Sequence, residues 1–118
     1  MILIDTSVWI DHFRRENMRL VQLLEAKQVL CHHFIVGELA SGHLRNRGEI
    51  IALLEKLPSA SAATHQEAMA FLEARRLSGR GIGYVDLHLL ASAALDRVPL
   101  WALDKTLMRV AASLGLDA

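Results

Sequence analysis

The chain opens with Ile2-Leu3-Ile4-Asp5 directly after Met1, so that three apolar residues lead into a carboxylate. This run is too short and too apolar for a surface helix, and it predicts a buried strand. Near the other end of the chain, Leu100-Trp101-Ala102-Leu103 leads into Asp104 in the same way. Because sites in open α/β sheets form beyond the carboxyl ends of the strands, both aspartates are expected at one edge of a sheet.

Helices and strands are expected to alternate between these two runs. Further strands are predicted at Val29–Cys31 and over Pro99–Leu103, and a capping box of Thr64 with Glu67 predicts the start of one helix. The predicted helices cover Val8–Arg14, Glu16–Lys27, Phe34–Ser41, Ile50–Leu57, Thr64–Ser78, Val85–Leu95 and Lys105–Leu114. Such alternation is typical of a parallel sheet covered by helices on both faces.

The bulk composition indicates an ordered, soluble protein. With 118 residues, of which 53% are hydrophobic, the chain can bury one core, and we expect a single α/β domain over residues 1–118. Its central parallel sheet is expected to have about four to five strands. The single Cys31 excludes an internal disulfide and fits a reducing compartment. No apolar stretch reaches the roughly 20 residues that span a bilayer, so a cytoplasmic protein without membrane association is expected.

Two more carboxylates interrupt apolar segments of the chain. Glu38 lies within Phe34–Ala40, and Asp86 lies within Tyr84–Leu87. A carboxylate among core-forming residues is costly to bury unless it has a partner. Four such residues, counting the two strand-end aspartates, indicate a shared counter-ion. Oxygen ligands favour Mg²⁺ or Mn²⁺ over zinc for that role.

Helix capping is the alternative explanation for part of this set. Asp5 and Asp104 each precede a predicted helix and could be N-caps and nothing more. Glu38 sits in the middle of its segment, and Asp86 is followed by apolar residues, so capping explains these two poorly. The predicted metal site therefore depends on all four carboxylates meeting at one place.

The charge balance is compatible with a nucleic-acid partner. The formal net charge is zero, from 13 basic and 13 acidic residues. Setting the four carboxylates aside leaves nine acidic residues against the thirteen basic ones, so neutrality can conceal an acidic pocket in a mildly basic body. The arginines form loose groups, which are most often solvated helix faces. These groups are Arg14-Arg15-Arg19, Arg45-Arg47 and Arg75-Arg76-Arg80.

Four segments, taken in order, resemble those of PIN-domain ribonucleases and, more narrowly, of the toxins of VapBC toxin–antitoxin pairs. The segments are Ile2–Asp11, Gly37–Leu39, Tyr84–Ala93 and Leu100–Lys105. The resemblance runs collinearly over nearly the whole chain. It implies a three-layer PIN-like fold, a homodimer, and inhibition by a cognate VapB-type antitoxin.

The resemblance also implies a site and an activity. The implied site for Mg²⁺ or Mn²⁺ consists of Asp5, Glu38, Asp86 and Asp104, supported by Thr6 and Ser7. The implied activity is endonucleolytic hydrolysis of RNA, possible targets including transfer RNA, by metal-activated water. One position departs from the family, which often has Thr or Ser two residues before the last aspartate, where this chain has Ala102.

Other functions remain open at this stage. A zinc site at Cys31-His32-His33 is disfavoured, because neighbours on a strand point to opposite faces and no second ligand pair follows. A phosphatase acting through an aspartyl phosphate at Asp5 is disfavoured by Ser7, where haloacid-dehalogenase-like enzymes have a second aspartate. The alternative outside enzymes is a catalytically weak PIN-like module that captures an antitoxin or RNA without cleavage.

Three aromatic side chains are assigned to packing rather than to function. Trp9 and Trp101 are expected in the core and not as platforms for nucleic-acid bases. His88 follows Asp86 by two residues, which is about 200° around a helix, so the two cannot share one ligand set. A packed or hydrogen-bonded histidine is expected there.

Overall fold

The centre of the computed structural model, which describes residues 1–118, is a parallel sheet with the strand order β2-β1-β3. The middle strand β1 (Ile2–Ile4) pairs with β2 (Val29–Leu30) on one side and with β3 (Leu100–Trp101) on the other. All residues of this sheet except Ile2 are buried, as expected for strands covered on both faces. The predicted α/β class with a parallel sheet is therefore confirmed.

The sheet has three strands, fewer than the predicted four to five. Its outer positions are filled by two isolated parallel bridges, Cys31 with Ser59 beside β2 and Leu100 with Asp117 beside β3. Each flanking segment makes one pair of backbone hydrogen bonds, such as Cys31 N to Pro58 O (2.8 Å) and Ala60 N to Cys31 O (2.8 Å). The additional strands are thus reduced to single bridges.

Strand β3 is also shorter than the predicted Pro99–Leu103. Beyond Trp101 the backbone leaves the ladder, because the Ala102 N–H donates to Met108 Sδ (3.3 Å) and the Leu103 N–H donates to Ser7 Oγ (2.9 Å). Asp104 therefore does not end a strand. It lies three residues beyond β3, at the start of the next helix.

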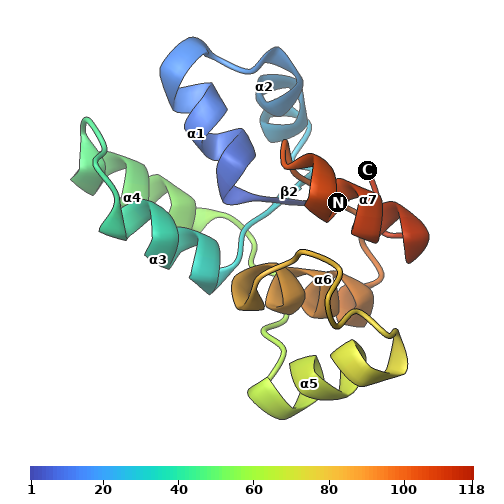
Figure 1. Cartoon of the computed structure of the whole chain (residues 1–118). Helices are drawn as coiled ribbons and strands as arrows, with labels where there is room; N and C mark the ends of the chain where they lie inside the picture. Colours follow the sequence, from blue (N-terminus) through green and yellow to red (C-terminus); the bar gives the residue numbers. More distant parts are fainter.

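Seven helices surround the sheet, and each corresponds to a predicted one. They are α1 (Thr6–Arg15), α2 (Met18–Glu25), α3 (His33–Ser41), α4 (Arg47–Lys56), α5 (His65–Ala74), α6 (Tyr84–Asp96) and α7 (Lys105–Ser113). In Figure 1, α1 and α2 lie above the sheet, α6 and α5 lie below it, and the α3–α4 pair packs to the left. The predicted capping box is present, with the Thr64 side chain accepting from the Glu67 N–H and Glu67 accepting from the Thr64 N–H.

The start of α2 differs from the prediction of a helix from Glu16. Glu16 has a φ of 50°, and the Asn17 side chain caps α2 by accepting from the Leu20 N–H (3.1 Å). The turn between α1 and α2 is thus formed by Glu16 and Asn17, which the periodicity of apolar residues did not distinguish from helix.

Helix α6 forms the centre of the lower layer. Its residues 87–93 are all buried, which confirms the prediction of a helix buried on most sides. Trp9 and Trp101, with exposed fractions of 4% and 7%, belong to the core as expected. None of the helices is sufficiently long and apolar to cross a membrane.

Candidate carboxylate site

Asp5 is the most deeply placed of the four predicted site carboxylates, with 8% of its surface exposed. Its backbone continues the sheet, donating from N to Trp101 O (2.9 Å), and its side chain caps α1. Asp5 Oδ2 accepts hydrogen bonds from the Ser7 N–H (3.0 Å) and the Ser7 hydroxyl (2.5 Å). The sheet and the helix start together fix this carboxylate.

The Ser7 hydroxyl joins Asp5 to the segment that carries Asp104. While donating to Asp5, Ser7 Oγ accepts from the Leu103 N–H (2.9 Å), a link between residues 96 positions apart. Asp104 follows this segment, is exposed, and caps α7 by accepting from the Leu107 N–H at Oδ1 (3.0 Å). Ser7 thus holds this loop in place through Leu103. Ala102, where the family often has a hydroxyl, cannot contribute a side-chain hydrogen bond.

Asp86 and Glu38 are the two site carboxylates that lie within helices, α6 and α3 respectively. Asp86 is half-buried in the first turn of α6, where its Oδ2 accepts from the Gly83 N–H (3.2 Å). Glu38 is exposed in the middle of α3, and its Oε1 accepts from the Thr6 hydroxyl (2.7 Å). Thr6 and Ser7 therefore each support a different carboxylate.

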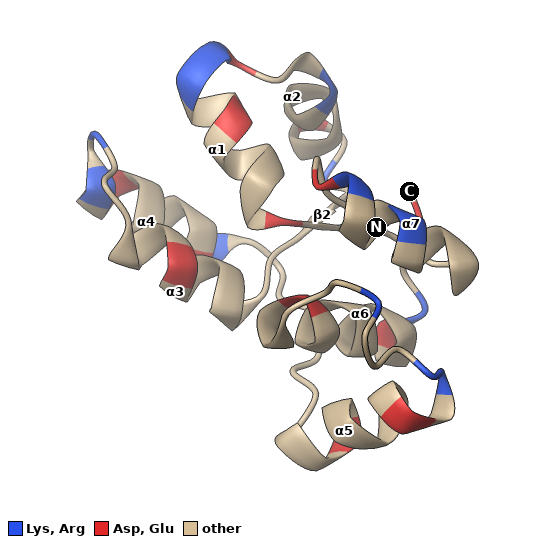
Figure 2. Cartoon of the chain, viewed as in Figure 1, with Lys and Arg blue, Asp and Glu red and all other residues tan.

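The four carboxylates lie near enough to influence one another. Burial raises the pKa of Asp86, and repulsion from Asp5, Asp104 and Glu38 acts in the same direction, against the opposing hydrogen bond from Gly83. Figure 2 shows acidic segments at the end of β1, on α3, in the first turns of α6 and at the start of α7. The structure thus brings together side chains from four separate elements.

Each of these carboxylates accepts hydrogen bonds from the protein at one oxygen only and leaves the other without a protein partner. The free oxygens are Asp5 Oδ1, Glu38 Oε2, Asp86 Oδ1 and Asp104 Oδ2. No cation offsets their charge, because the one ion pair of the chain joins Arg15 to Asp11 (2.7 Å). No three Asp, Glu, His or Cys side chains stand close enough together to hold one metal ion in this conformation.

Two expectations about these residues need correction. Glu38 and Asp104 are exposed, so the cost of burying a charge applies to Asp5 and in part to Asp86 but not to the whole set. Asp86 also has a role at the helix start, where its side chain accepts from the N–H of the N-cap residue Gly83, a contact that the sequence did not indicate. Glu38 alone of the four does not accept a hydrogen bond at the start of a helix.

His32 belongs to the interior and is not placed as a metal ligand. Its Nδ1 accepts from the Phe34 N–H (3.0 Å), so the neutral ring carries its proton on Nε2, which lies 3.0 Å from Ser92 Oγ. Burial lowers the pKa of His32 to about 4 and raises the pKa of the neighbouring Cys31 thiol. Both ring nitrogens of His32 are therefore engaged inside the protein.

The sequence did not indicate a cavity that borders this site. It lies between α1 and the α3–α4 connection and has Glu38, Arg14 and Arg45 among its lining residues. The two arginines belong to groups that were expected to be solvated faces. No local sequence signal distinguishes them, because only the tertiary fold brings Arg14 and Arg45 to one cavity.

The chain is similar to known proteins over almost its whole length. The PIN domain family matches residues 2–113 of the chain. Ribonuclease VapC32 of Mycobacterium tuberculosis, found in each of two strains, is 43% identical over 117 residues, covering 98% of this chain and 94% of the relative. The chain therefore belongs to the PIN domain family and, within it, is a relative of the VapC-type proteins.

Proposed function

We propose that this chain is a metal-dependent endoribonuclease, the toxin component of a type II toxin–antitoxin system. The observation that carries the proposal is the set of four carboxylates from four elements, each with one oxygen free of protein partners and none with a cation beside it. The similarity to a protein named a ribonuclease supports RNA as the substrate.

The donor set suits a hard divalent cation. All four side chains offer carboxylate oxygens, which match Mg²⁺ or Mn²⁺, and their mutual repulsion would be relieved by a bound cation. Such an ion, when bound, lowers the pKa of water and neutralises charge on a reacting phosphate. Asp5 and Asp104 are proposed as direct ligands, and Asp86 as a direct or water-mediated ligand.

The remaining side chains hold this set in place. Glu38 is proposed to orient the attacking water, with Thr6 fixing one of its oxygens and leaving the other for that task. Ser7 fixes Asp5 Oδ2, so that Oδ1 is left for the ion. Because water supplies the nucleophile in this scheme, no reactive serine or cysteine is required.

The partners are proposed from the family. They are an RNA substrate, with transfer RNA as one candidate, a cognate VapB-type antitoxin, and a second copy of the chain in a homodimer in the cytoplasm. The exposed Leu53, Met69 and Leu95 are available for contacts with other chains. The departure at Ala102 removes no carboxylate, and the Ser7 contact to Leu103 orders the adjacent loop.

The test is cleavage of total cellular RNA by the purified, antitoxin-free protein with Mg²⁺ or Mn²⁺, and again with EDTA. We expect EDTA-sensitive cleavage that is lost in Asp5→Asn, because asparagine caps a helix about as well as aspartate. Asp117→Asn is the matched control, since Asp117 is exposed and its carboxylate makes no hydrogen bond or ion pair. Cleavage that persists in Asp5→Asn would contradict the proposed site.

The second candidate is a binding module without catalysis. It is favoured by one observation, namely that no three of the possible ligands already stand within reach of one ion. In that case the acidic site would capture a cation such as an arginine of the antitoxin. Antitoxin binding without any metal-dependent cleavage by the wild type would favour this candidate over the nuclease.

A further inference from the structure

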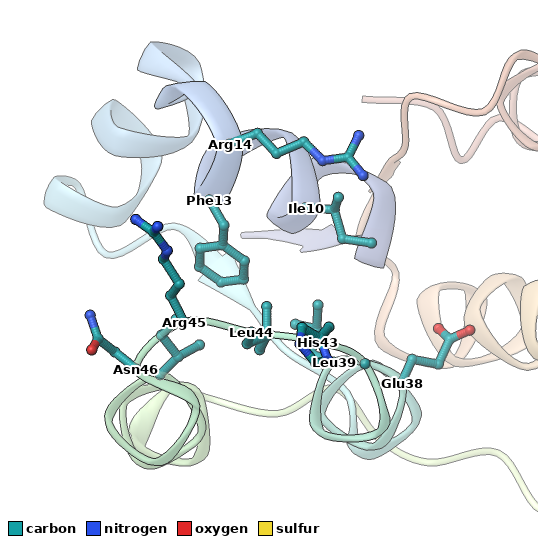
Figure 3. A pocket seen from close by; sticks show the side chains of 11 residues that line it. Ile10, Phe13, Arg14, Glu38, Leu39, His43, Leu44, Arg45 and Asn46 are labelled. Atoms are coloured by element: carbon teal, nitrogen blue, oxygen red, sulfur yellow. The ribbon is translucent and has the colours of Figure 1, made fainter.

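A cavity of about 600 Å³ opens beside the carboxylate site, between α1 and the connection from α3 to α4. This volume lies in the range of small-molecule sites. Its wall is apolar in the middle, where in Figure 3 the Phe13 ring on α1 points toward Leu44 on the connection. The apolar lining residues are Ile10, Phe13, Leu39, Leu44 and Ile50.

Glu38 connects this cavity to the carboxylate site. It is the only acidic residue in the lining, yet it also raises the pKa of Asp86 and so belongs to both places. Figure 3 shows its carboxylate directed away from Leu39 and the cavity interior. Glu38 therefore stands at the boundary between the cavity and the carboxylate site.

Two arginines stand at opposite ends of the cavity. In Figure 3, the Arg14 guanidinium extends past Ile10 on the side of Glu38, whereas Arg45 rises beside Asn46 at the far end. Neither guanidinium forms an ion pair or a hydrogen bond with the protein, since the one ion pair joins Arg15 to Asp11. Both cations are free to bind an anionic ligand.

We infer that this cavity is the subsite for the nucleotide adjacent to the cleaved bond, an inference that rests on the proposed nuclease function. The base of that nucleotide would contact the apolar wall at Phe13 and Ile10. Its two flanking phosphates would be bound by Arg14 and Arg45.

The chemistry of the lining favours a single strand of RNA. A base can meet the wall only when it is unstacked, as in single-stranded loops, and aromatic and apolar surfaces accept any base. An apolar peptide would leave the two arginines without partners. Single-stranded RNA carries a phosphate on either side of each nucleoside. This pattern matches a cavity with an apolar centre and an arginine at each end.

The test measures binding of RNA by fluorescence anisotropy, in the Asp5→Asn background so that the RNA stays intact. The probe is a fluorescein-labelled oligouridylate, compared with its duplex with oligoadenylate. We expect Arg14→Ala and Arg45→Ala each to weaken binding of the single strand about tenfold. Each should also reduce the slope of log Kd against log salt by about 0.7, the value for one lost phosphate contact.

Two further variants separate the apolar contact from general effects of charge. Ile10→Ala, at a residue that is 37% exposed, is expected to weaken binding about threefold, as for a lost apolar contact, with no change in the salt slope. Arg109→Ala is the matched control, because Arg109 is an exposed helical arginine on α7 without an ion pair. It should leave both quantities unchanged.

The outcomes separate this inference from the proposed function, because the same substitutions are also assayed for RNA cleavage with Asp5 restored. If the wild type cleaves RNA and Arg14→Ala and Arg45→Ala bind the probe as tightly as Arg109→Ala, the subsite is wrong and the nuclease stands. If these variants instead keep RNA binding and lose only a co-expressed protein partner, the occupant is that protein and the inference is overturned. If the wild type never cleaves, the proposed function fails and the assignment as a cleavage subsite fails with it.

Discussion

Two polar clusters flank the first turns of α6, and they differ in whether their polar groups are charged. One is the carboxylate site, with Asp86 as its member on α6. The other, which we call the histidine cluster, consists of His32, His33, Phe34, His65, Tyr84 and His88. The carboxylates repel one another and each leaves an oxygen free, whereas the histidine cluster is held together by packing of its rings.

The histidine cluster is a continuous series of ring contacts. His32 stacks on His33 with centroids 4.6 Å apart, and His88 lies between Phe34 (4.8 Å) and Tyr84 (4.5 Å). Burial lowers the pKa of both His32 and His88, so both rings are neutral at neutral pH. Within this cluster the two buried histidines, His32 and His88, are accommodated without charge.

The contrast predicts that the histidine cluster serves folding and that the carboxylate cluster serves the proposed function. A fold can accommodate a buried histidine by keeping it neutral. Burial of Asp86 and its repulsion by Asp5, Asp104 and Glu38 disfavour its charged form, and carboxylates perturbed in this way collect at functional sites. Substitutions in the two clusters should therefore affect different properties of the protein.

The largest expected effect is on cleavage. Asp104→Asn keeps the hydrogen bond to the Leu107 N–H that caps α7, but removes a charge from the proposed ion site. We expect the rate of RNA cleavage to fall about a thousandfold, as for the loss of a principal electrostatic contact at a reacting phosphate. Initial rates on total RNA measure this, with circular dichroism to confirm folding. A loss of less than tenfold would reassign Asp104 to capping alone.

The second expected effect is on the pH dependence of stability. His32 has a pKa of about 4 in the folded chain against an ordinary 6.5, so the unfolded chain takes up a proton first as the pH falls. The stability present above pH 6.5 is therefore lost between about pH 6.5 and pH 4, by up to about 3 kcal/mol. The lowered pKa of His88 acts with the same sign, and the raised pKa of Asp86 acts with the opposite sign.

Urea unfolding across this pH range measures the effect. His32→Asn is the informative variant, because the asparagine oxygen can still accept from the Phe34 N–H while the titrating group is gone. Its stability should vary less with pH than that of the wild type, whatever its absolute value. An identical pH dependence in the two proteins would assign the acid sensitivity to other groups.

A third, smaller effect is expected at Ser7. Ser7→Ala removes the hydroxyl that donates to Asp5 and accepts from Leu103, and it keeps the backbone N–H that donates to the Asp5 side chain capping α1. We expect a loss of about 1–2 kcal/mol in the free energy of unfolding and a fall in cleavage rate of about tenfold or more, as for residues that support a metal ligand. If stability falls but the cleavage rate does not, Ser7 serves the fold alone.

The smallest effect is expected in the histidine cluster. Neither buried ring nitrogen of His88 makes a well-formed hydrogen bond, the Ala63 backbone being its one nearby partner, and this disfavours the folded state. His88→Phe removes these atoms and keeps an aromatic ring between Phe34 and Tyr84, so we expect stability to rise by about 1 kcal/mol and cleavage to stay within about twofold of the wild type. Thermal unfolding and the RNA assay check the two halves. A large loss of cleavage with intact folding would extend the functional site into this cluster.

The order of helices and strands could be predicted from the sequence because local patterns determine it. The run before Asp5 predicted β1, and the pair Thr64 and Glu67 predicted the start of α5. The short β3 could not be predicted, because its end depends on a hydrogen bond from Leu103 to Ser7, far away in the chain. The reduction of the outer strands to bridges is likewise a property of tertiary pairing.

The proximity of the four carboxylates could be predicted from the sequence, but the environment of each could not. Strand ends and helix starts placed Asp5, Asp86 and Asp104 at one edge. The exposure of Glu38 and the capping role of Asp86 could not be predicted, because flanking apolar residues on a helix do not determine which way a side chain faces. The cavity with Arg14 and Arg45 depends on the packing of α1 against α3, which no local pattern encodes.

The most direct test of the central claim is a calorimetric titration of Mn²⁺ into the antitoxin-free protein and into Asp5→Asn. If the four carboxylates form an ion site, the wild type will show saturable binding and Asp5→Asn will lose it, while Asp117→Asn will bind as the wild type does. Absence of Mn²⁺ binding by the wild type, or equal binding by Asp5→Asn, would contradict the account of this site.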